Sequence, residues 1–262
     1  MQTREKLKNL FNQSKYNTSN RLTTISTSRI SDLEINSLFN QYPPLSDGIP
    51  VTLRSVEFEN KSIYYGEMAI DGNFRHGRGI TIWNDGSRYE GYWENNKANG
   101  KGKLVHSDGD IYEGEWKNDK SNGYGVYKHN DGATYKGNWL DDKQNGKGVE
   151  EWPDGSKYEG TYENGLKNGY GTYFWSDGSC YKGYFKDNIF HGKGIYEWAD
   201  KRQYVGDWKD NKMDGNGIFI WPDGRKYEGD YKEDKEEGYG ILEWGNGNIY
   251  NIFIYSFDMK TN

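Results

Sequence analysis

A tyrosine returns every 23 residues through most of this chain, and this repeat limits the possible fold more than any other feature. The tyrosines that hold the period are Tyr89, Tyr112, Tyr135, Tyr158, Tyr181, Tyr204, Tyr227 and Tyr250. Counted from each of these tyrosines except Tyr250, glycine recurs two, eleven and thirteen residues later, and an aromatic residue recurs four residues later. A fixed period of this length is typical of proteins in which one small structural unit is stacked many times.

Each unit is predicted to form a hairpin of two strands. Tyr112, Gly114 and Trp116 alternate with charged residues, so they share one face of a first strand. After a polar turn, the glycines at positions eleven and thirteen and the large residues that follow them are expected to alternate onto one face of a second strand. Pairs such as Asp131 and Gly132 then close the unit, because such turns need a residue that accepts a positive φ.

The fold class predicted from this pattern is all-β: a single elongated, twisted, antiparallel meander sheet of about eight 23-residue hairpin repeats. Only 33% of the residues are hydrophobic, yet the chain contains 10 Trp, 23 Tyr and 10 Phe, so aromatic rings must supply the buried surface. We expect each glycine to leave bare backbone on which a ring from the neighbouring strand lies flat. Such nesting lets a single sheet bury enough surface to stay folded.

The phrase Tyr-Glu-Gly-Glu-Trp-Lys-Asn at 112–118, followed by Asn-Gly-x-Gly and in other copies by Pro-Asp-Gly, resembles the MORN (membrane occupation and recognition nexus) repeat. The resemblance covers residues 64–249. It implies a sheet of successive hairpins with an aromatic-rich groove face, in a family that includes structural proteins of cilia, membrane-junction proteins and accessory modules on enzymes. The resemblance therefore implies scaffolding more than chemistry. One departure is Lys201, which replaces the glycine of the Asp-Gly turn and is expected either to hold an unfavourable positive φ or to force a different turn between two regular units.

The predicted organisation has four segments. Residues 1–50 are expected to form a largely extended or disordered N-terminal arm, with a short helix at 31–42 capped by Ser31. Residues 51–63 are predicted to form capping strands, and 64–249 the array of about eight repeats. Residues 250–262 are predicted to form a capping or docking strand.

Two protein-binding surfaces are predicted. The first is an aromatic groove lined by Tyr112, Trp116, Tyr135, Trp139, Tyr158, Tyr162, Trp175, Tyr181, Trp198, Trp208 and Trp221. The second is the C-terminal docking strand, formed by Ile252, Phe253, Ile254, Tyr255 and Phe257. Because this strand has large apolar groups on both faces, we expect it to add to the edge of a partner's sheet or to pair with itself in a dimer.

Catalytic and metal chemistry are not indicated by the sequence. Nearly every Asp and Glu occupies a position that recurs around the array, whereas catalysis needs a few singular groups. His106 and His129 are one period apart, which places them roughly 10 Å from each other, so we interpret both as packing aromatics rather than shared metal ligands. We expect a non-enzymatic protein without cofactor or metal.

The predicted function is a structural scaffold that binds protein segments within a larger cytoskeletal assembly, and the expectation that this assembly is ciliary rests on the resemblance alone. The expected partners are other proteins of a multi-subunit assembly, with a homodimer through the C-terminal end as a further form. The net charge of −6 disfavours anionic membranes and nucleic acid, although lysines recur in the first turn of several repeats. The alternative function is a membrane-associated phosphoinositide-binding or lipid-kinase-regulating module. We expect a location in the cytoplasm and cytoskeleton, with a cilium or flagellum as the specific structure.

Overall fold

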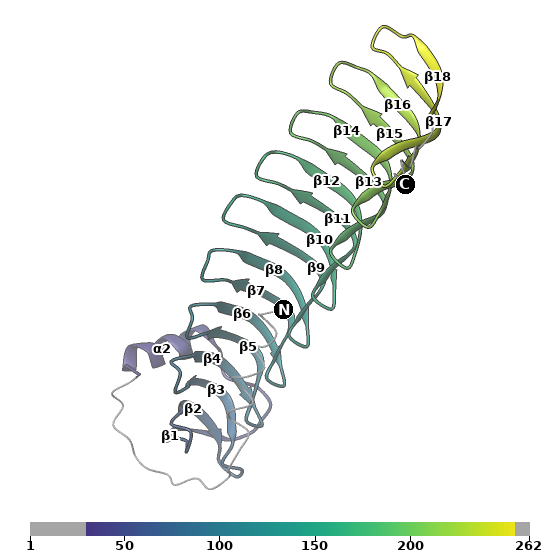
Figure 1. Ribbon diagram of the computed structural model, residues 1–262. Helices are drawn as coiled ribbons and strands as arrows, with labels where there is room; N and C mark the ends of the chain where they lie inside the picture. The colour runs from purple at the N-terminus through teal and green to yellow at the C-terminus, as the bar shows by residue number, and fades with distance from the viewer. Residues whose placement is uncertain (1–29, 255–262) are drawn as a thin grey trace, which may run out of the picture. The chain divides into compact units, whose positions relative to one another are not determined.

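The structure is a computed structural model that describes residues 30–254, and these are almost entirely β-strand (Figure 1). Most of the N-terminal arm, together with Tyr255 and Phe257 of the C-terminal strand, lies outside the described residues. The chain divides into two compact units, Met1–Gln144 and Asn145–Asn262. Within residues 30–254, no helix is long and apolar enough to cross a membrane.

Unit 1 contains one helix and an antiparallel meander in which each strand pairs with the next along the chain. Its elements are α2 (Asp32–Gln41), β1 (Val51–Glu57), β2 (Ile63–Ala69), β3 (Arg75–Ile82), β4 (Arg88–Glu94), β5 (Lys97–Val105), β6 (Ile111–Lys117), β7 (Lys120–Lys128) and β8 (Thr134–Leu140).

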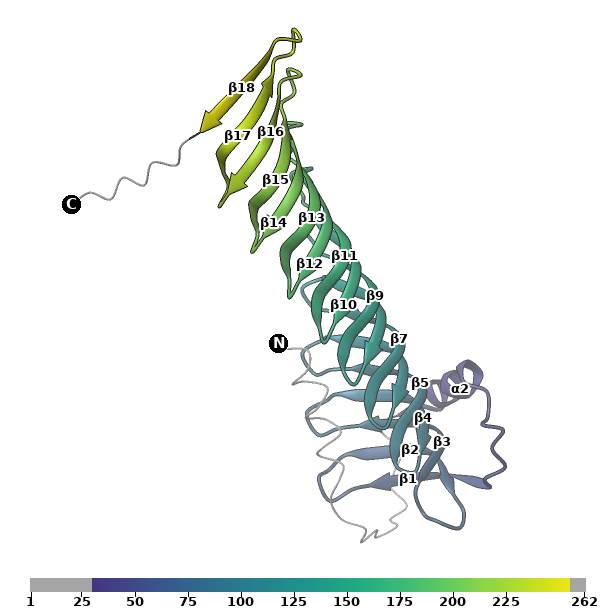
Figure 2. The same cartoon turned by 90° about the vertical axis from the view of Figure 1, so that its right-hand side faces the viewer.

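Unit 2 is a second run of the same meander, again with each strand paired to the next in chain order (Figure 2). Its strands are β9 (Lys143–Glu151), β10 (Lys157–Glu163), β11 (Leu166–Phe174), β12 (Cys180–Lys186), β13 (Ile189–Glu197), β14 (Gln203–Lys209), β15 (Lys212–Ile220), β16 (Lys226–Lys232), β17 (Lys235–Glu243) and β18 (Ile249–Ile254). The predicted all-β meander of antiparallel hairpin repeats is therefore confirmed.

The tyrosine that opens each repeat packs on a pair of glycines that face each other across two strands. Tyr112 is fully buried, and a Cβ added to Gly114 or to its partner Gly125 would come within 3.0 Å of the tyrosine ring or hydroxyl. The Tyr112 hydroxyl donates a hydrogen bond to the Glu115 carbonyl at 2.9 Å. The predicted nesting of rings on glycine is confirmed, with the addition that each ring covers a glycine of its own strand as well as one of the next strand.

A second ring locks each tyrosine in place from the side. Trp116 meets Tyr112 edge to face at 5.0 Å and meets Tyr89 of the preceding repeat at 5.3 Å. The indole nitrogen of Trp116 donates to the carbonyl of Gly102 at 3.0 Å. Edge-to-face pairs of this kind add roughly 0.5–1.5 kcal/mol each beyond the area they bury. We call this side of the sheet the ring face: it carries the repeat tyrosines and the aromatic residues four positions later.

The glycine eleven residues after each tyrosine does not have the role that alternation predicts. Gly123 has a φ of 79° and lies where the register of β6 and β7 shifts. A Cβ at Gly123 would collide with Glu115, not with the Tyr112 ring. The assignment of this glycine to the ring face is wrong, because a bulge changes the alternation and a period-two pattern cannot show a bulge. Glycine is needed here for its positive φ.

Lys201 has a φ of 72°, as predicted for the residue that replaces the turn glycine. Its ammonium pairs with Glu197 at 2.8 Å, but this pair is exposed and therefore stabilises little. Because the left-handed conformation costs a non-glycine residue roughly 1–2 kcal/mol, we expect Lys201→Gly to raise the free energy of unfolding by about 1 kcal/mol. Urea denaturation of both proteins measures this difference. A less stable variant would mean that the ion pair outweighs the backbone strain.

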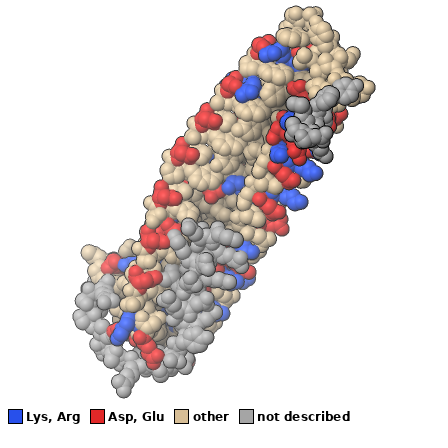
Figure 3. Space-filling model, in the orientation of Figure 1, with Lys and Arg blue, Asp and Glu red and all other residues tan. Residues whose placement is uncertain are grey.

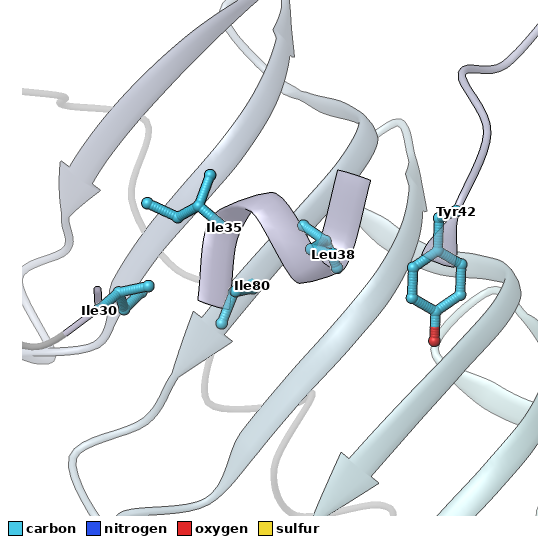
Figure 4. Close-up of a cluster of buried hydrophobic side chains, with 5 residues drawn as sticks. All are labelled: Ile30, Ile35, Leu38, Tyr42 and Ile80. Carbon is cyan, nitrogen blue, oxygen red and sulfur yellow. The ribbon is translucent and has the colours of Figure 1, made fainter. Parts of the chain in front are cut away.

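Helix α2 lies on the side of the sheet opposite the ring face (Figure 4). It begins after Ser31, whose side chain accepts a hydrogen bond from the Glu34 amide while the Glu34 carboxylate accepts one from the Ser31 amide. This capping box fixes the start of the helix. Ile35 and Leu38 on one side of the helix pack with Ile80 of β3 in a buried cluster.

Acid is expected to loosen this helix. The Ser31 amide and then the Arg88 guanidinium, 2.6 Å from the carboxylate, lower the pKa of Glu34 to about 2. A carboxyl with a lowered pKa contributes stability above its unfolded value, and that stability is lost as the pH falls from about 4.5 towards 2. We expect nuclear magnetic resonance signals of α2 to shift across this window. The Glu34→Gln variant should not show this transition; an identical transition in the variant would assign it to another group.

Candidate protein-docking site

Most of the predicted aromatic groove is inside the protein. Tyr112, Trp116, Tyr135, Trp139, Tyr158, Tyr162, Tyr181 and Trp208 are all buried. Each of these rings meets another of the eight edge to face, so the residues form the internal packing of the sheet and do not line an open groove. The prediction is corrected for these eight residues. Trp175, Trp198 and Trp221 are only half-buried and keep an accessible edge.

An open depression lies instead on the opposite side of the sheet in unit 2. We call this side the groove face. It carries the residues one, three, twelve and fourteen positions after each repeat tyrosine. The depression has a volume of about 820 Å³. We call it the unit 2 groove, and its exposed apolar lining consists of Tyr170, Tyr184, Ile195, Val205, Tyr239 and Ile241. Glycine pairs such as Gly194 and Gly206 also line it.

The apolar side chains of the groove form a row flanked by aromatic pairs. Ile195 faces Val205 across β13 and β14, and Ile218 and Ile241 hold the same repeat position on β15 and β17. Two pairs of rings lie two residues away from the aliphatic row along their strands. The Tyr170 and Tyr184 rings are 5.4 Å apart, and the Tyr239 and Phe253 rings are 4.3 Å apart. The groove therefore has an aliphatic row along one side and an aromatic pair at each end of the other side.

Charged groups lie between and beside these apolar residues. Lys193 pairs with Asp207 at 2.8 Å, and the Asn216 amide donates a hydrogen bond to Asp230. Lys182 on β12 and Glu228 on β16 lie in line with the aliphatic row, and both are exposed. Within residues 30–254, neither takes part in an ion pair. The stretch of the groove formed by Ile195, Val205 and Ile218 is thus flanked by a free positive charge on one side and a free negative charge on the other.

In unit 1 the groove face is occupied by a segment of the chain itself. Ile80 follows Gly79 as Ile195 follows Gly194, and Ile80 is covered by Ile35 and Leu38 of α2. Arg78 holds the repeat position of Lys193. Its guanidinium lies 4.4 Å from the Phe39 ring, pairs with Glu67 at 2.6 Å and donates to the Tyr42 carbonyl at 3.1 Å.

Beyond this helix, the groove face of unit 1 has a depression of its own. The Tyr92 hydroxyl donates to the Pro43 carbonyl at 2.7 Å, which holds the segment after α2 against the sheet. Next to this contact, a depression of about 1140 Å³ continues past Leu45 to Tyr124 and Val126. The groove face therefore accepts a helix and the extended chain that follows it, by apolar contacts and by hydrogen bonds to carbonyl groups.

The C-terminal strand β18 presents part of the predicted docking surface. Phe253 is exposed and packs on Tyr239, while Ile252 and Ile254 are half-buried. Their role in docking stays a prediction. We expect a chain ending at Gly247 to be incorporated less well into its native assembly, because the aromatic pair at this end of the groove is lost. Light scattering and a binding assay measure this, and unchanged mass with full incorporation would reduce β18 to a cap.

The histidines and acidic side chains of the described residues do not form a metal site. Within residues 30–254, no group of three or more His, Cys, Asp or Glu side chains is placed to hold a metal ion. His129 lies 4.7 Å from the Tyr127 ring and 3.5 Å from Asp110, and His106 is buried 6.5 Å from the same ring. Both histidines pack among rings, which is the position that tryptophan takes in other repeats.

Stacked hairpins with buried rings on one face and a groove on the other define a repeat protein with an extended docking surface. The MORN repeat model matches residues 71–88, 89–111, 112–134, 135–157, 158–180, 181–201, 204–224 and 227–249. These stretches make up more than half of the chain, so the chain belongs to the MORN repeat family. No curated protein sequence matches it.

Solved structures give only distant likenesses. A mutant of the TCP10 domain of Danio rerio CPAP is 12% identical, with a TM-score of 0.41, over 77% of this chain and 99% of that one. The TCP domain of Drosophila melanogaster SAS-4, in complex with a proline-rich motif of Ana2, is also 12% identical, with a TM-score of 0.32, over 81% of this chain and 96% of that one. At these scores, neither likeness carries a conclusion about this protein.

Proposed function

We propose that the protein is a non-enzymatic scaffold that binds a protein segment in the unit 2 groove, as part of a larger cytoskeletal assembly. One observation carries this proposal. In unit 1, α2 covers the groove face at Ile80, whereas in unit 2 the same repeat position presents the exposed side chains of Ile195 and Ile241.

The exposed side chains of the groove are those that gain most from being covered. Tyr239 is 76% exposed, Tyr184 51% and Ile241 45%. Fully burying one large apolar side chain is worth roughly 1.5–3 kcal/mol, and aromatic residues are enriched where proteins bind each other. Contiguous exposed apolar residues on a soluble protein mark interaction sites. Several such residues in one groove support binding of a protein segment.

The charge distribution favours a protein partner over a lipid surface. On the face drawn in Figure 3, acidic side chains lie at intervals along both margins, and basic side chains lie among them. An anionic membrane is recognised by clustered lysine and arginine, whereas here the signs are mixed and the net charge is −6. We propose a cytoskeletal assembly, and a cilium in particular, because the MORN repeat family includes structural proteins of such assemblies.

The test compares three full-length proteins in extracts of the native cell, each with a photo-crosslinking residue at Asn251 in the groove lining. They are the unaltered chain, the groove variant Ile218→Glu with Ile241→Glu, and the control Leu166→Glu. Leu166 is an exposed leucine of unit 2 that does not line the groove. We expect one cytoskeletal partner to crosslink to the first and third proteins and not to the groove variant.

Two results would overturn the proposal. The first is a partner that crosslinks equally to the groove variant, because the groove would then play no part in its binding. The second is salt-sensitive flotation of the unaltered chain on anionic liposomes without any groove-dependent protein partner, which would support the lipid-binding alternative.

A further inference from the structure

We infer that the segment bound in the unit 2 groove is an amphipathic α-helix of about 13 residues, lying across strands β12 to β16 with its amino end over β16. The inference rests on the proposed function and adds the class and the direction of the segment. The spacing of the aliphatic row, the helix held in unit 1 and the two charges that flank Ile195, Val205 and Ile218 support it independently.

The spacing of the aliphatic row matches a helix better than an extended chain. Ile195, Val205 and Ile218 lie on three consecutive strands, and adjacent strands are roughly 4.8 Å apart. A helix advances about 5.4 Å per turn, so a helix across the strands brings one residue of its apolar stripe to nearly every strand. An extended chain returns to the same side only every ~6.6 Å and loses register after two or three strands.

Unit 1 shows that a helix fits on this face. Ile35 and Leu38 of α2 bury the side chain of Ile80, the counterpart of Ile195, Ile218 and Ile241. Arg78, the counterpart of Lys193, donates a hydrogen bond to the carbonyl of Tyr42, the residue that caps the carboxyl end of α2. The groove face therefore holds a helix by an aliphatic contact on its side and a cation at its carboxyl end.

The charges on either side of Ile195, Val205 and Ile218 set the direction of the helix. Lys182 on β12 flanks this stretch of the groove on one side, and Glu228 on β16 flanks it on the other. These strands are four spacings apart, which is about 19 Å, or about 13 helical residues at 1.5 Å each. A helix has partial positive charge at its amino end and partial negative charge at its carboxyl end. The favourable direction places the amino end over Glu228 and the carboxyl end over Lys182.

Two displayed peptide libraries test the class of segment. Both contain 14-residue peptides with an apolar residue every three or four positions, and in the second library two central prolines prevent a helix. Each library is selected on the full chain after depletion on the Ile218→Glu variant. We expect only the first library to yield binders. These should bind Ile218→Glu, and separately Ile195→Glu, at least tenfold more weakly than they bind the unaltered chain or Leu166→Glu.

The direction is tested with a photo-crosslinking group placed at either end of a selected peptide. We expect the group at the amino end to label β16 or β17 and the group at the carboxyl end to label β12 or β13. Selected peptides should also lose affinity for Lys182→Glu by about threefold or more. The reverse labelling pattern, or tighter binding to Lys182→Glu, would overturn the direction.

The outcomes separate this inference from the proposed function. If the proline-containing library yields the groove-dependent binders, or neither library yields any, the helix is excluded as the occupant. The proposed function still stands in that case if the native partner crosslinks to the groove and fails to crosslink to the groove variant. If selected helices bind the Ile218→Glu and Ile195→Glu variants as well as the unaltered chain, the helix site is elsewhere and the inference is overturned.

Discussion

Replacing Gly160 with alanine is expected to lower the free energy of unfolding by about 3 kcal/mol, although it adds a single methyl group. The new Cβ would overlap the hydroxyl and ring of Tyr158, and it would lie 2.7 Å from the Cα of Gly171 on the neighbouring strand. Tyr158 is fully buried and has no room to move, and Gly171 is backbone that pairs directly with Gly160. The strands would have to separate at this point.

A matched control isolates the effect of the ring. Gly165 has a φ of 86°, and a Cβ there would have no atom within 4 Å. Gly165→Ala should therefore cost only the strain of the left-handed backbone, roughly 1–2 kcal/mol. Thermal and urea unfolding of the two variants measure the difference. If Gly165→Ala proves the more damaging of the two, backbone strain and not ring nesting governs stability in this sheet.

The features that repeat were readable from the sequence. The hairpins follow from alternation around Tyr112, Gly114 and Trp116, and the nesting follows from glycine recurring beside a ring. These positions are the same in every copy because each hairpin has the same neighbours. A residue that faces the same environment in every repeat leaves a periodic signal, and this signal predicted the fold.

The error in the predicted aromatic groove has the same origin. The most regular aromatic residues, such as Tyr181 and Trp208, are regular because they pack against each other and are therefore buried. The groove lining changes from copy to copy, with Tyr170, Lys193 and Asn216 at one repeat position. In the sequence, this variation on the face opposite the rings is typical of a strand surface exposed to solvent. The bulge at Gly123 also hid which side chains share that face.

The second large effect is expected in helix α2. Leu38 is 2% exposed, and its truncation to alanine should cost about 2–5 kcal/mol of packing against the sheet. Because a ten-residue helix is marginal in water without tertiary contacts, α2 should detach and lose its helical structure. Hydrogen exchange should show protection lost across residues 32–41, while the backbone amides of β12 to β17 remain protected.

Leu33 of the same helix provides the control, because it is 81% exposed and its truncation removes almost no contact. Leu33→Ala should leave exchange of the helix unchanged, so the two variants separate loss of docking from loss of helix propensity. If Leu38→Ala keeps its protection, Arg78 and the capping box hold α2 without the apolar contact on Ile80. A helix would then need little apolar contact with this face. The contact of α2 with Ile80 would no longer support a helix on the aliphatic row of the unit 2 groove. Loss of protection in Leu38→Ala alone would instead show that one aliphatic contact decides whether this face holds a helix.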